Sequence, residues 1–407
     1  MTKKLYYDHN IKECDALVLA CRKGEDGFEV LLDQTVIYPE GGGQLSDRGF
    51  IDGAAVPYAF EEGEDIWHRC EKAFEEGARV HVRFDEAVRF DHSQQHTGEH
   101  MLSGLASSMF GCANVGFHMA EDYVSVDFDK PLSDEEVDAL ELAANEAIQR
   151  NEPTAYKIVD AEVLEQMTLR KRAAGLSGEI RIVYTGGVDS CTCCGTHTAS
   201  AGEVGVLKIT AHANHRGGTR MFFLCGMRAV RSMIKDREHL DVIARRFSTK
   251  PEEAVQVVVK QGDELAETRR LLKQRTGELF AYRAQALYQN AVKAGDAAIV
   301  VGLEKGLNMP ELGMLCEQLL ACGKAVAVML SQTDGALLYR MARSTGVELS
   351  MKEVCLAVNA ATGGKGGGRD DAAQGSAPER KDAKEICAQL ETYLKNRLNA
   401  AKSSKKT

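Results

Sequence analysis

Two histidines, His96 and His100, stand four positions apart in the segment QQHTGEH. On an α-helix this spacing places both imidazoles on one face, about one turn apart, an arrangement that suits a divalent metal ion. The apolar residues that follow, such as Leu102 and Leu105, fall on a different face, so the pair does not lie on the face predicted for the core. Small neighbours such as Ser103 leave room, and we predict that the pair faces a ligand.

A second set of metal-binding residue types lies in DSCTCCGTH, which runs from Asp189 to His197. Cys193 is four positions before His197, and Cys191 and Cys194 are competing thiols that spacing alone does not exclude. A thiolate together with imidazoles binds a borderline-soft ion better than it binds Mg²⁺ or Ca²⁺. If the two segments meet in the fold, three histidines and one cysteine predict a Zn²⁺ site.

Composition places both segments in a folded chain of several domains. The 407 residues are 44% hydrophobic and 27% charged, which is near the globular norm, and the length predicts two or three domains. The apolar stretches are far shorter than the ~20 residues of a membrane span, and the N-terminus has no signal-peptide core. Twelve scattered cysteines favour free thiols or a metal site over a disulfide scaffold. We expect a soluble, cytoplasmic protein whose net charge of −10 argues against nucleic-acid binding by bulk charge.

The hydrophobic pattern predicts an α+β fold. Residues 1–90 read as strands around a KGEDG turn and predict a small β-barrel with the glycine-rich loop YPEGGGQLSDRG. Residues 91–230 combine a helix at 93–110 with strands, but they lack the regular alternation of a doubly wound sheet. Residues 293–400 alternate strands and helices, which predicts a C-terminal α/β domain.

Residues 236–292 are charged, poor in glycine and favourable to helix. Val258, Leu265, Leu272 and Leu279 recur every seven positions, as in a coiled coil, but polar companion positions argue against a full seam. We predict a helical arm, and this arm or the C-terminal domain is the candidate contact of a homodimer.

Taken together, these motifs resemble those of a known family. QQHTGEHMLSGL and the CxxxH of Cys193 to His197 are similar to the editing domain of alanyl-tRNA synthetase and, more closely, to the freestanding AlaX family of alanyl-tRNA editing proteins. YPEGGGQLSDRG, GFHMAEDYVSVDFD and GGKGGGR follow in the family's order, so the resemblance spans nearly the whole chain. It implies the long AlaX form, with a β-barrel, a zinc-dependent editing domain, a helical arm and a DHHA1-type C-terminal domain.

The resemblance also implies which residues act. The implied zinc ligands are His96, His100, Cys193 and His197. The family usually has CGGTH where this chain has CCGTH, so Cys194 replaces a glycine, and the CxxxH register selects Cys193.

Other positions receive roles in the same way. Thr97 resembles the family residue that contacts the hydroxyl of serine. Gln44 and Asp91 are candidate catalytic groups because their motifs should face the pocket, although Asp91 also fits the N-cap of the histidine-bearing helix. The candidate tRNA contacts near the editing domain, which ordinary solvated faces would also explain, are Arg170, Lys171, Arg172, Arg216, Arg220, Arg228 and Arg231. A further tRNA-binding segment, whose amides and cations would approach phosphates, consists of Gly363, Gly364, Lys365, Gly366, Gly367, Gly368 and Arg369.

The implied activity is hydrolysis of the ester that joins serine, and also glycine, to tRNA(Ala). A pocket built for alanine rejects these amino acids weakly, because a methyl or a hydroxyl group is worth only about 1–3 kcal/mol, so a second, hydrolytic sieve is needed. We expect no aminoacylation, because the β-domain begins almost at Met1 and leaves no room for a synthetase domain. The alternatives are a non-catalytic RNA-binding module with a structural zinc, and a metal-dependent esterase that acts on another acylated RNA.

Overall fold

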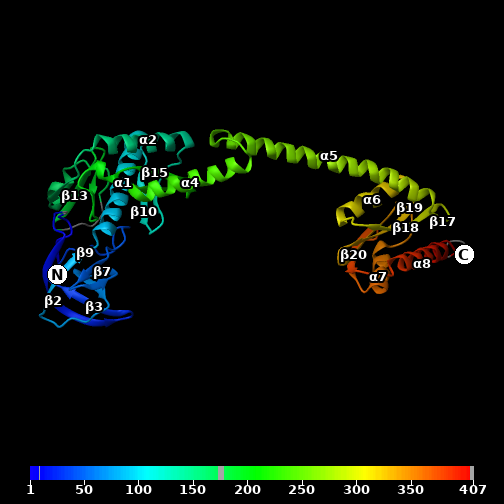
Figure 1. Cartoon of the computed structure of the whole chain (residues 1–407), viewed down its shortest axis with the longest axis horizontal. Helices are drawn as coiled ribbons and strands as arrows, with labels where there is room; N and C mark the ends of the chain where they lie inside the picture. Colours follow the sequence, from blue (N-terminus) through cyan, green and yellow to red (C-terminus); the bar gives the residue numbers. More distant parts are fainter. Residues whose placement is uncertain (9, 173–177, 404–407) are drawn as a thin grey trace. The chain divides into compact units, whose positions relative to one another are not determined.

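The computed structural model describes residues 1–8, 10–172 and 178–403, and the chain divides into two compact units (Figure 1). The N-terminal unit is Met1–Pro251 and the C-terminal unit is Glu252–Thr407. No helix in the described ranges is both long enough and apolar enough to cross a membrane.

A curled sheet of seven antiparallel strands opens the N-terminal unit. Its strand order is β6-β5-β9-β2-β3-β8-β7, and β6 contacts β8, so the sheet is nearly closed into the expected barrel. Strand β9 illustrates how one face of the sheet forms the core. In RVHVRF the alternate residues Val80, Val82 and Phe84 are buried and the others are exposed. The strands of this part are β1 (Lys3–Lys4), β2 (Glu13–Gly24), β3 (Gly27–Leu32), β4 (Gln34–Thr35), β5 (Gly49–Ile51), β6 (Ala54–Val56), β7 (Tyr58–Glu62), β8 (Asp65–Cys70) and β9 (Arg79–Phe84).

Helix α1 (Glu86–Phe110) carries the histidine pair. Asp85 caps its N-terminus, with a carboxylate that accepts two backbone N–H groups of the first turn, and Gly111 ends it in the left-handed conformation. The helix therefore begins earlier than predicted, and the interpretation of Asp91 as its N-cap is wrong because Asp85 supplies the cap. Residues 92–104 are all buried, so the polar face of α1 is enclosed together with its apolar face.

Two further sheets surround α1. One has the order β10-β11-β16-β15 and the other has the order β12-β13-β14. Helix α2 opens with a capping box, in which Ser133 and Glu136 exchange both hydrogen bonds. The elements of this part are β10 (Asn114–Met119), β11 (Val124–Phe128), α2 (Asp134–Arg150), β12 (Ala155–Val159), α3 (Ala161–Glu165), β13 (Ile180–Thr185), β14 (Asp189–Thr192), the 3₁₀ turn η1 (Ala201–Val204), β15 (Leu207–His215), β16 (Gly218–Cys225) and α4 (Gly226–Arg246).

The C-terminal unit is a six-stranded sheet with helices. Its order is β17-β18-β19-β20-β22-β21, in which only the β18–β19 pair is parallel. Helix α6 packs against β19 and β20, and α7 packs against β21 and β22. Its elements are α5 (Ala254–Gln289), β17 (Val292–Ala294), β18 (Ala297–Lys305), α6 (Met309–Ala321), β19 (Ala325–Thr333), β20 (Ala336–Arg343), α7 (Met351–Thr362), β21 (Lys365–Gly368), β22 (Ala372–Pro378) and α8 (Ala383–Ser403); the short η2 (Pro251–Glu253) precedes α5.

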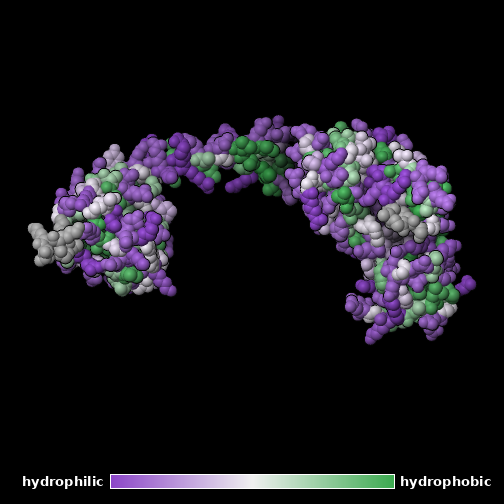
Figure 2. All heavy atoms as spheres, turned by 180° about the vertical axis from the view of Figure 1, so that it is seen from behind, coloured by the Kyte–Doolittle hydropathy of each residue, from purple (hydrophilic) through white to green (hydrophobic). Residues whose placement is uncertain are grey.

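The predicted helical arm corresponds to two helices, α4 and α5, which belong to different units. The seven-residue row of α5 is exposed along its length: the exposed fractions are 44% for Val258, 47% for Leu265, 66% for Leu272 and 64% for Leu279. Figure 2 shows hydrophobic side chains at the surface of this helix among charged ones. A homodimer through this row remains a prediction.

The glycine-rich segment GGKGGGR contains an edge strand. Gly363 ends α7, and residues 365–368 form β21, which pairs with β22. The cause is close packing: a Cβ at Gly366 would lie 2.5 Å from the carbonyl oxygen of Gln374, and one at Gly364 would lie 2.6 Å from that of Ser376. These glycines let the two strands meet.

Candidate metal centre

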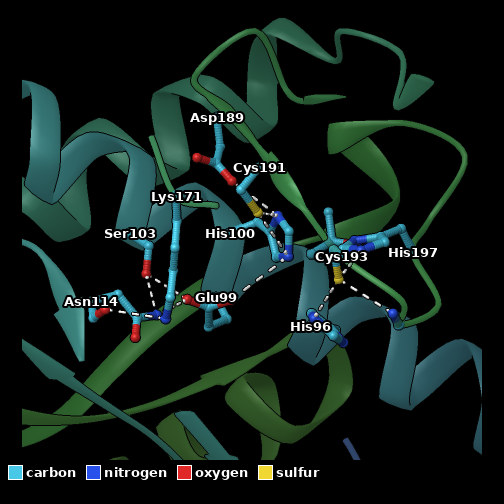
Figure 3. Close-up of polar contacts among 12 residues, drawn as sticks. His96, Glu99, His100, Ser103, Asn114, Lys171, Asp189, Cys191, Cys193 and His197 are labelled. Carbon is cyan, nitrogen blue, oxygen red and sulfur yellow. Dashed lines mark hydrogen bonds and ion pairs between the residues drawn. The ribbon is translucent and has the colours of Figure 1, made fainter. Parts of the chain in front are cut away.

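Four side chains from the two metal-ligand motifs converge in the N-terminal unit (Figure 3). The nitrogen and sulfur donors of His96, His100, Cys193 and His197 all lie within 4.8 Å of one another. The Sγ atom of Cys193 is 3.4 Å from Nε2 of His96 and 3.4 Å from Nε2 of His197. Ligand atoms around a tetrahedral Zn²⁺ are separated by roughly 3.3–3.8 Å, as follows from the usual Zn–N and Zn–S bond lengths. The donor types and their spacing therefore fit this ion.

Helix α1 supplies two of these donors, and the loop after β14 supplies the other two. Arg181 of β13 fixes the loop, because its Nη1 donates to the carbonyl oxygens of Cys193 (3.2 Å) and Gly195 (2.9 Å). Gly195 has to be glycine, since a Cβ there would lie 2.1 Å from Cε1 of His96. The close approach of loop and helix brings the two motifs together.

The competing thiols have different surroundings. Cys194 is exposed, and its backbone does not adopt the left-handed conformation, so a side chain is tolerated where the family usually has glycine. Cys191 is buried on another side of His100, with its Sγ 3.5 Å from Nδ1, and forms a second small group with His100 and Asp189. Cys193 is the thiol that faces all three histidines.

Asp189 orients His100. Its Oδ2 lies 2.9 Å from Nδ1 of His100, and its carboxylate also forms an ion pair with Arg170. Burial alone would raise the pKa of Asp189, but the hydrogen bonds from His100 and Arg170 outweigh it and hold the pKa well below its usual range. A carboxylate that accepts from Nδ1–H leaves Nε2 free as a donor toward a metal, the usual arrangement behind a metal-bound histidine.

Gln44 orients His96 in the same way. Its Oε1 lies 2.7 Å from Nδ1 of His96 and also accepts the backbone N–H of Thr196, while its Nε2 donates to the Thr196 hydroxyl. The side chain is fully buried. Because a neutral amide is not a base, the position of Gln44 favours orienting His96 over transferring a proton.

Thr97 lies behind the third histidine. Its Oγ1 is 3.4 Å from Nδ1 of His197 and accepts the backbone N–H of Thr198, and its side chain is fully buried. Thr97 therefore holds the loop that carries His197.

The electrostatics favour metal-binding protonation states for Cys193 and His197 but not for His100. Burial lowers the pKa of His197 to about 3, so its ring stays neutral. Burial opposes ionisation of Cys193, but the imidazoles of His96 and His100 outweigh it and hold the pKa of the thiol well below its usual value. A neutral imidazole and a thiolate are the forms that bind a metal ion.

The His100 imidazole differs from that of His197. Burial opposes the charged form of His100, but Cys191, Cys193 and the hydrogen bond to Asp189 outweigh it and raise the pKa well above its usual value. A metal ion would therefore displace a proton there.

Three candidate residues, Asp91, Arg170 and Arg228, form ion pairs within the protein. Asp91 forms an ion pair with Arg228, whose Nε is 2.9 Å from each carboxylate oxygen, and so joins α1 to α4. Of the candidate tRNA contacts, Arg228 and Arg170 are mostly buried in ion pairs with carboxylates, which does not favour contact with a phosphate. The position of Asp91 likewise does not favour a role in proton transfer.

Sequence reasoning missed two buried carboxylates. Besides Asp189, Glu99 is 4% exposed, with Oε1 2.5 Å from the hydroxyl of Ser103 and 2.5 Å from Nδ2 of Asn114. Its Oε2 lies 3.9 Å from Nε2 of His100 (Figure 3). Their positions in the sequence could have identified both carboxylates, because Glu99 directly precedes His100 and Asp189 opens the segment DSCTCCGTH.

The predicted tRNA-binding segment lies in the C-terminal unit. Lys365 is exposed, and so is Arg369, whose side chain is 85% exposed and lies 3.4 Å from Asp371. Gly367 has open space where a Cβ would be, whereas Gly364, Gly366 and Gly368 pack against β22.

Comparison with known proteins finds family matches in two separate parts of the chain. Residues 180–221 match the family described as the threonyl and alanyl tRNA synthetase second additional domain, a range that includes Cys193 and His197. Residues 295–396 match the DHHA1 domain, which confirms the predicted type of the C-terminal domain.

Three relatives span nearly the whole chain. It is 30% identical over 392 residues to the alanyl-tRNA editing protein AlaX-L of Pyrococcus horikoshii, covering 92% of this chain and 94% of that protein. It is 28% identical to the alanyl-tRNA editing protein Aarsd1 of Danio rerio, covering 96% of both. It is also 29% identical to the alanine–tRNA ligase of Pyrococcus abyssi, covering 97% of this chain but 44% of that enzyme. The protein thus belongs to the family of alanyl-tRNA editing proteins, as its motifs predicted.

Proposed function

We propose that this protein is a trans-editing deacylase that hydrolyses the ester bond of tRNA(Ala) mischarged with serine or glycine. The observation that carries the proposal is the convergence of His96, His100, Cys193 and His197 in the segment similar to synthetase editing domains. Homologues named alanyl-tRNA editing proteins support the reaction class. The buried and preoriented donors support Zn²⁺ as the ion.

Four protein ligands would close a tetrahedral zinc site, so the ion would polarise the ester carbonyl or a water molecule with one ligand loosely held or with expanded coordination, or it would anchor the substrate instead. The chain's own contribution is orientation. Gln44 and Asp189 each accept from Nδ1–H of one histidine, which fixes the tautomer that presents Nε2 to the ion. Thr97 holds His197 and the loop beside it. Glu99 is a buried carboxylate next to His100 and is our candidate proton acceptor.

The test is the rate of deacylation of Ser-, Gly- and Ala-tRNA(Ala) by the purified, zinc-loaded protein. We expect hydrolysis of the serine ester, and also of the glycine ester, while Ala-tRNA(Ala) is spared. A folded, zinc-containing protein that binds tRNA but hydrolyses none of the three would favour the RNA-binding module with a structural zinc.

The role of Thr97 in selectivity has its own test. The residue resembles the family position that contacts the serine hydroxyl, and its Oγ1 also anchors the His197 loop. We expect Thr97→Val to lower the preference for Ser-tRNA(Ala) over Ala-tRNA(Ala), because the replacement keeps the shape and removes the hydroxyl. Thr97→Ser, which keeps the hydroxyl, is the matched control. Unchanged selectivity in Thr97→Val would remove Thr97 from substrate discrimination.

We also propose that the segment from Gly363 to Arg369 contacts the body of the tRNA. Exposed Lys365 and Arg369 at an edge strand provide two cations, and the open position at Gly367 lets a phosphate approach the backbone. Replacing both cations with alanine should weaken tRNA binding and reduce its salt dependence by about two phosphate contacts, measured as the slope of log Kd against log salt concentration. An unchanged slope would contradict the contact.

A further inference from the structure

A cavity of about 490 Å³ shares a wall with the metal centre. His197 lines it, together with its loop neighbours Thr196 and Thr198. The remaining walls come from the barrel, the first turns of α1, and strands β12 and β13, so the cavity lies entirely within the N-terminal unit. Its volume falls within the roughly 300–1,000 Å³ of small-molecule sites.

The cavity is lined by aromatic rings and two arginines, of which Arg89 is paired with Asp47 and Arg181 lies between two tyrosine rings. The carbon of the Arg181 guanidinium lies 4.7 Å from the ring centre of Tyr7 and 5.2 Å from that of Tyr156. Tyr156 is 47% exposed and Phe90 is 46% exposed, although both are large apolar surfaces. Exposed aromatic rings beside an arginine form a surface on which a nucleobase stacks.

Two polar atoms of the lining residues have no hydrogen-bond partner within the described residues. They are Nε of Arg181 and Oγ1 of Thr154, and both are buried. Such atoms are uncommon in folded proteins and call for a partner that the chain itself does not supply. Both atoms belong to residues of this one cavity.

We propose that this cavity receives the terminal adenosine of the aminoacyl-tRNA, with the base stacked on Tyr156 and on the Arg181–Tyr7 pair. The inference rests on the proposed function and names the part of the substrate that the N-terminal unit recognises. The scissile ester is carried by the ribose of that nucleoside, so the base has to bind one sugar away from the reacting carbonyl. Because His197 lines the cavity and belongs to the metal centre, the two sites adjoin each other, as this arrangement needs.

The first experiment separates binding from chemistry. For Tyr156→Ala we expect the KM for Ser-tRNA(Ala) to rise about 5- to 100-fold, the range of a lost base–aromatic stack, with kcat and zinc content close to those of the wild type. Tyr156→Phe keeps the ring and should restore the KM. Tyr123→Ala removes a tyrosine that is 40% exposed in the same unit but does not line the cavity, and it should behave as the wild type. An unchanged KM in Tyr156→Ala would overturn the proposal.

A second experiment does not depend on hydrolysis. Titration calorimetry of the full-length protein should show that AMP binds more tightly than ribose 5-phosphate, which lacks the base, and that Tyr156→Ala removes this difference. Equal binding of the two compounds by the wild type would overturn the adenosine site. If AMP binds as expected but no charged tRNA is hydrolysed, the cavity assignment stands and the proposed deacylase function fails.

Discussion

Buried histidines occur in two regions of the N-terminal unit, and they have different surroundings. His68, on β8, is fully buried in the barrel, where Nε2 lies 2.8 Å from the hydroxyl of Thr35 and Nδ1 lies 3.1 Å from the carbonyl oxygen of Val30. Both nitrogens are thus used by neighbouring barrel residues. His96 and His100 are equally buried, but each uses only Nδ1 for an orienting partner.

The difference lies in the second nitrogen. In the metal centre the Nε2 atoms of His96 and His197 point toward a shared thiolate, that of Cys193. Because His96 and His100 direct Nδ1–H to their orienting partners, the inward Nε2 atoms and the thiolate present lone pairs to one another without a hydrogen-bond donor between them, so the group suits a cation at its middle. Burial of a histidine therefore does not indicate function, whereas an inward-facing second nitrogen does.

The largest expected effect comes from removing an inward-facing nitrogen. Loss of a partner behind a ligand typically costs about 10- to 100-fold in metal affinity or activity, so loss of the ligand in His96→Ala should cost more than about 100-fold in deacylation. Circular dichroism should show an unchanged fold, and metal analysis should show lost zinc.

The barrel histidine is the contrast to this variant. His68→Ala removes a ring whose two hydrogen bonds lie within the barrel, so it should lower the melting temperature while the remaining folded protein still binds zinc. If His96→Ala unfolds the protein as well, zinc has the structural role of the alternative RNA-binding module and the comparison between the regions fails.

A smaller effect is expected at the orienting carboxylate. Asp189→Asn keeps the size of the side chain but weakens the hold on Nδ1 of His100, and should lower zinc affinity about 10- to 100-fold. Competition with a chelator measures this directly. Asp127→Asn is the matched control, because Asp127 also pairs with an arginine, Arg220, yet lies outside the metal centre. Equal zinc affinity in Asp189→Asn would show that the carboxylate serves only Arg170.

Much of the site was predictable because it is encoded locally. The four-residue spacings of His96/His100 and Cys193/His197 are visible in the sequence, and the family resemblance indicated that the two segments form one site. The orienting partners were not predictable in this way. Gln44 reaches His96 across more than fifty positions of sequence, and this pairing depends on how the barrel packs against α1.

The fold shows the same limit. The hairpin around the KGEDG turn and the capping box at Ser133 are local signals, and both are present in the structure. The start of α1 was misplaced because two aspartates, Asp85 and Asp91, both suit an N-cap, and packing decides between them. Gly366 and Gly368 of β21 fit beside β22 because they lack a side chain, and this packing depends on a partner strand that composition alone does not identify.

The stability of the protein should also depend on pH through His68, the buried histidine of the barrel. Burial lowers the pKa of His68 to about 4, below the ~6.5 of an unfolded histidine, so acid protonates the unfolded state first. The stability contributed by neutral His68 is complete above about pH 6.5 and is lost as the pH falls toward 4, which amounts to about 2 kcal/mol between pH 7 and pH 5. Urea unfolding at both pH values measures it. His68→Gln, which does not titrate, should lose less stability over this interval, and an equal loss would contradict the assignment.

The smallest effect is expected at Cys194. Its replacement tests whether Cys193, and not the neighbouring thiol, is the metal ligand. Cys194 is exposed and lies outside both groups of metal-ligand residues, so Cys194→Ser should change stability by no more than about 0.5 kcal/mol and leave the zinc content unchanged. Cys193→Ser, the matched change one position earlier, should remove zinc because a hydroxyl does not replace a thiolate ligand. Loss of zinc in Cys194→Ser with retention in Cys193→Ser would reverse the ligand assignment and would mean that the loop after β14 turns its other thiol toward the histidines.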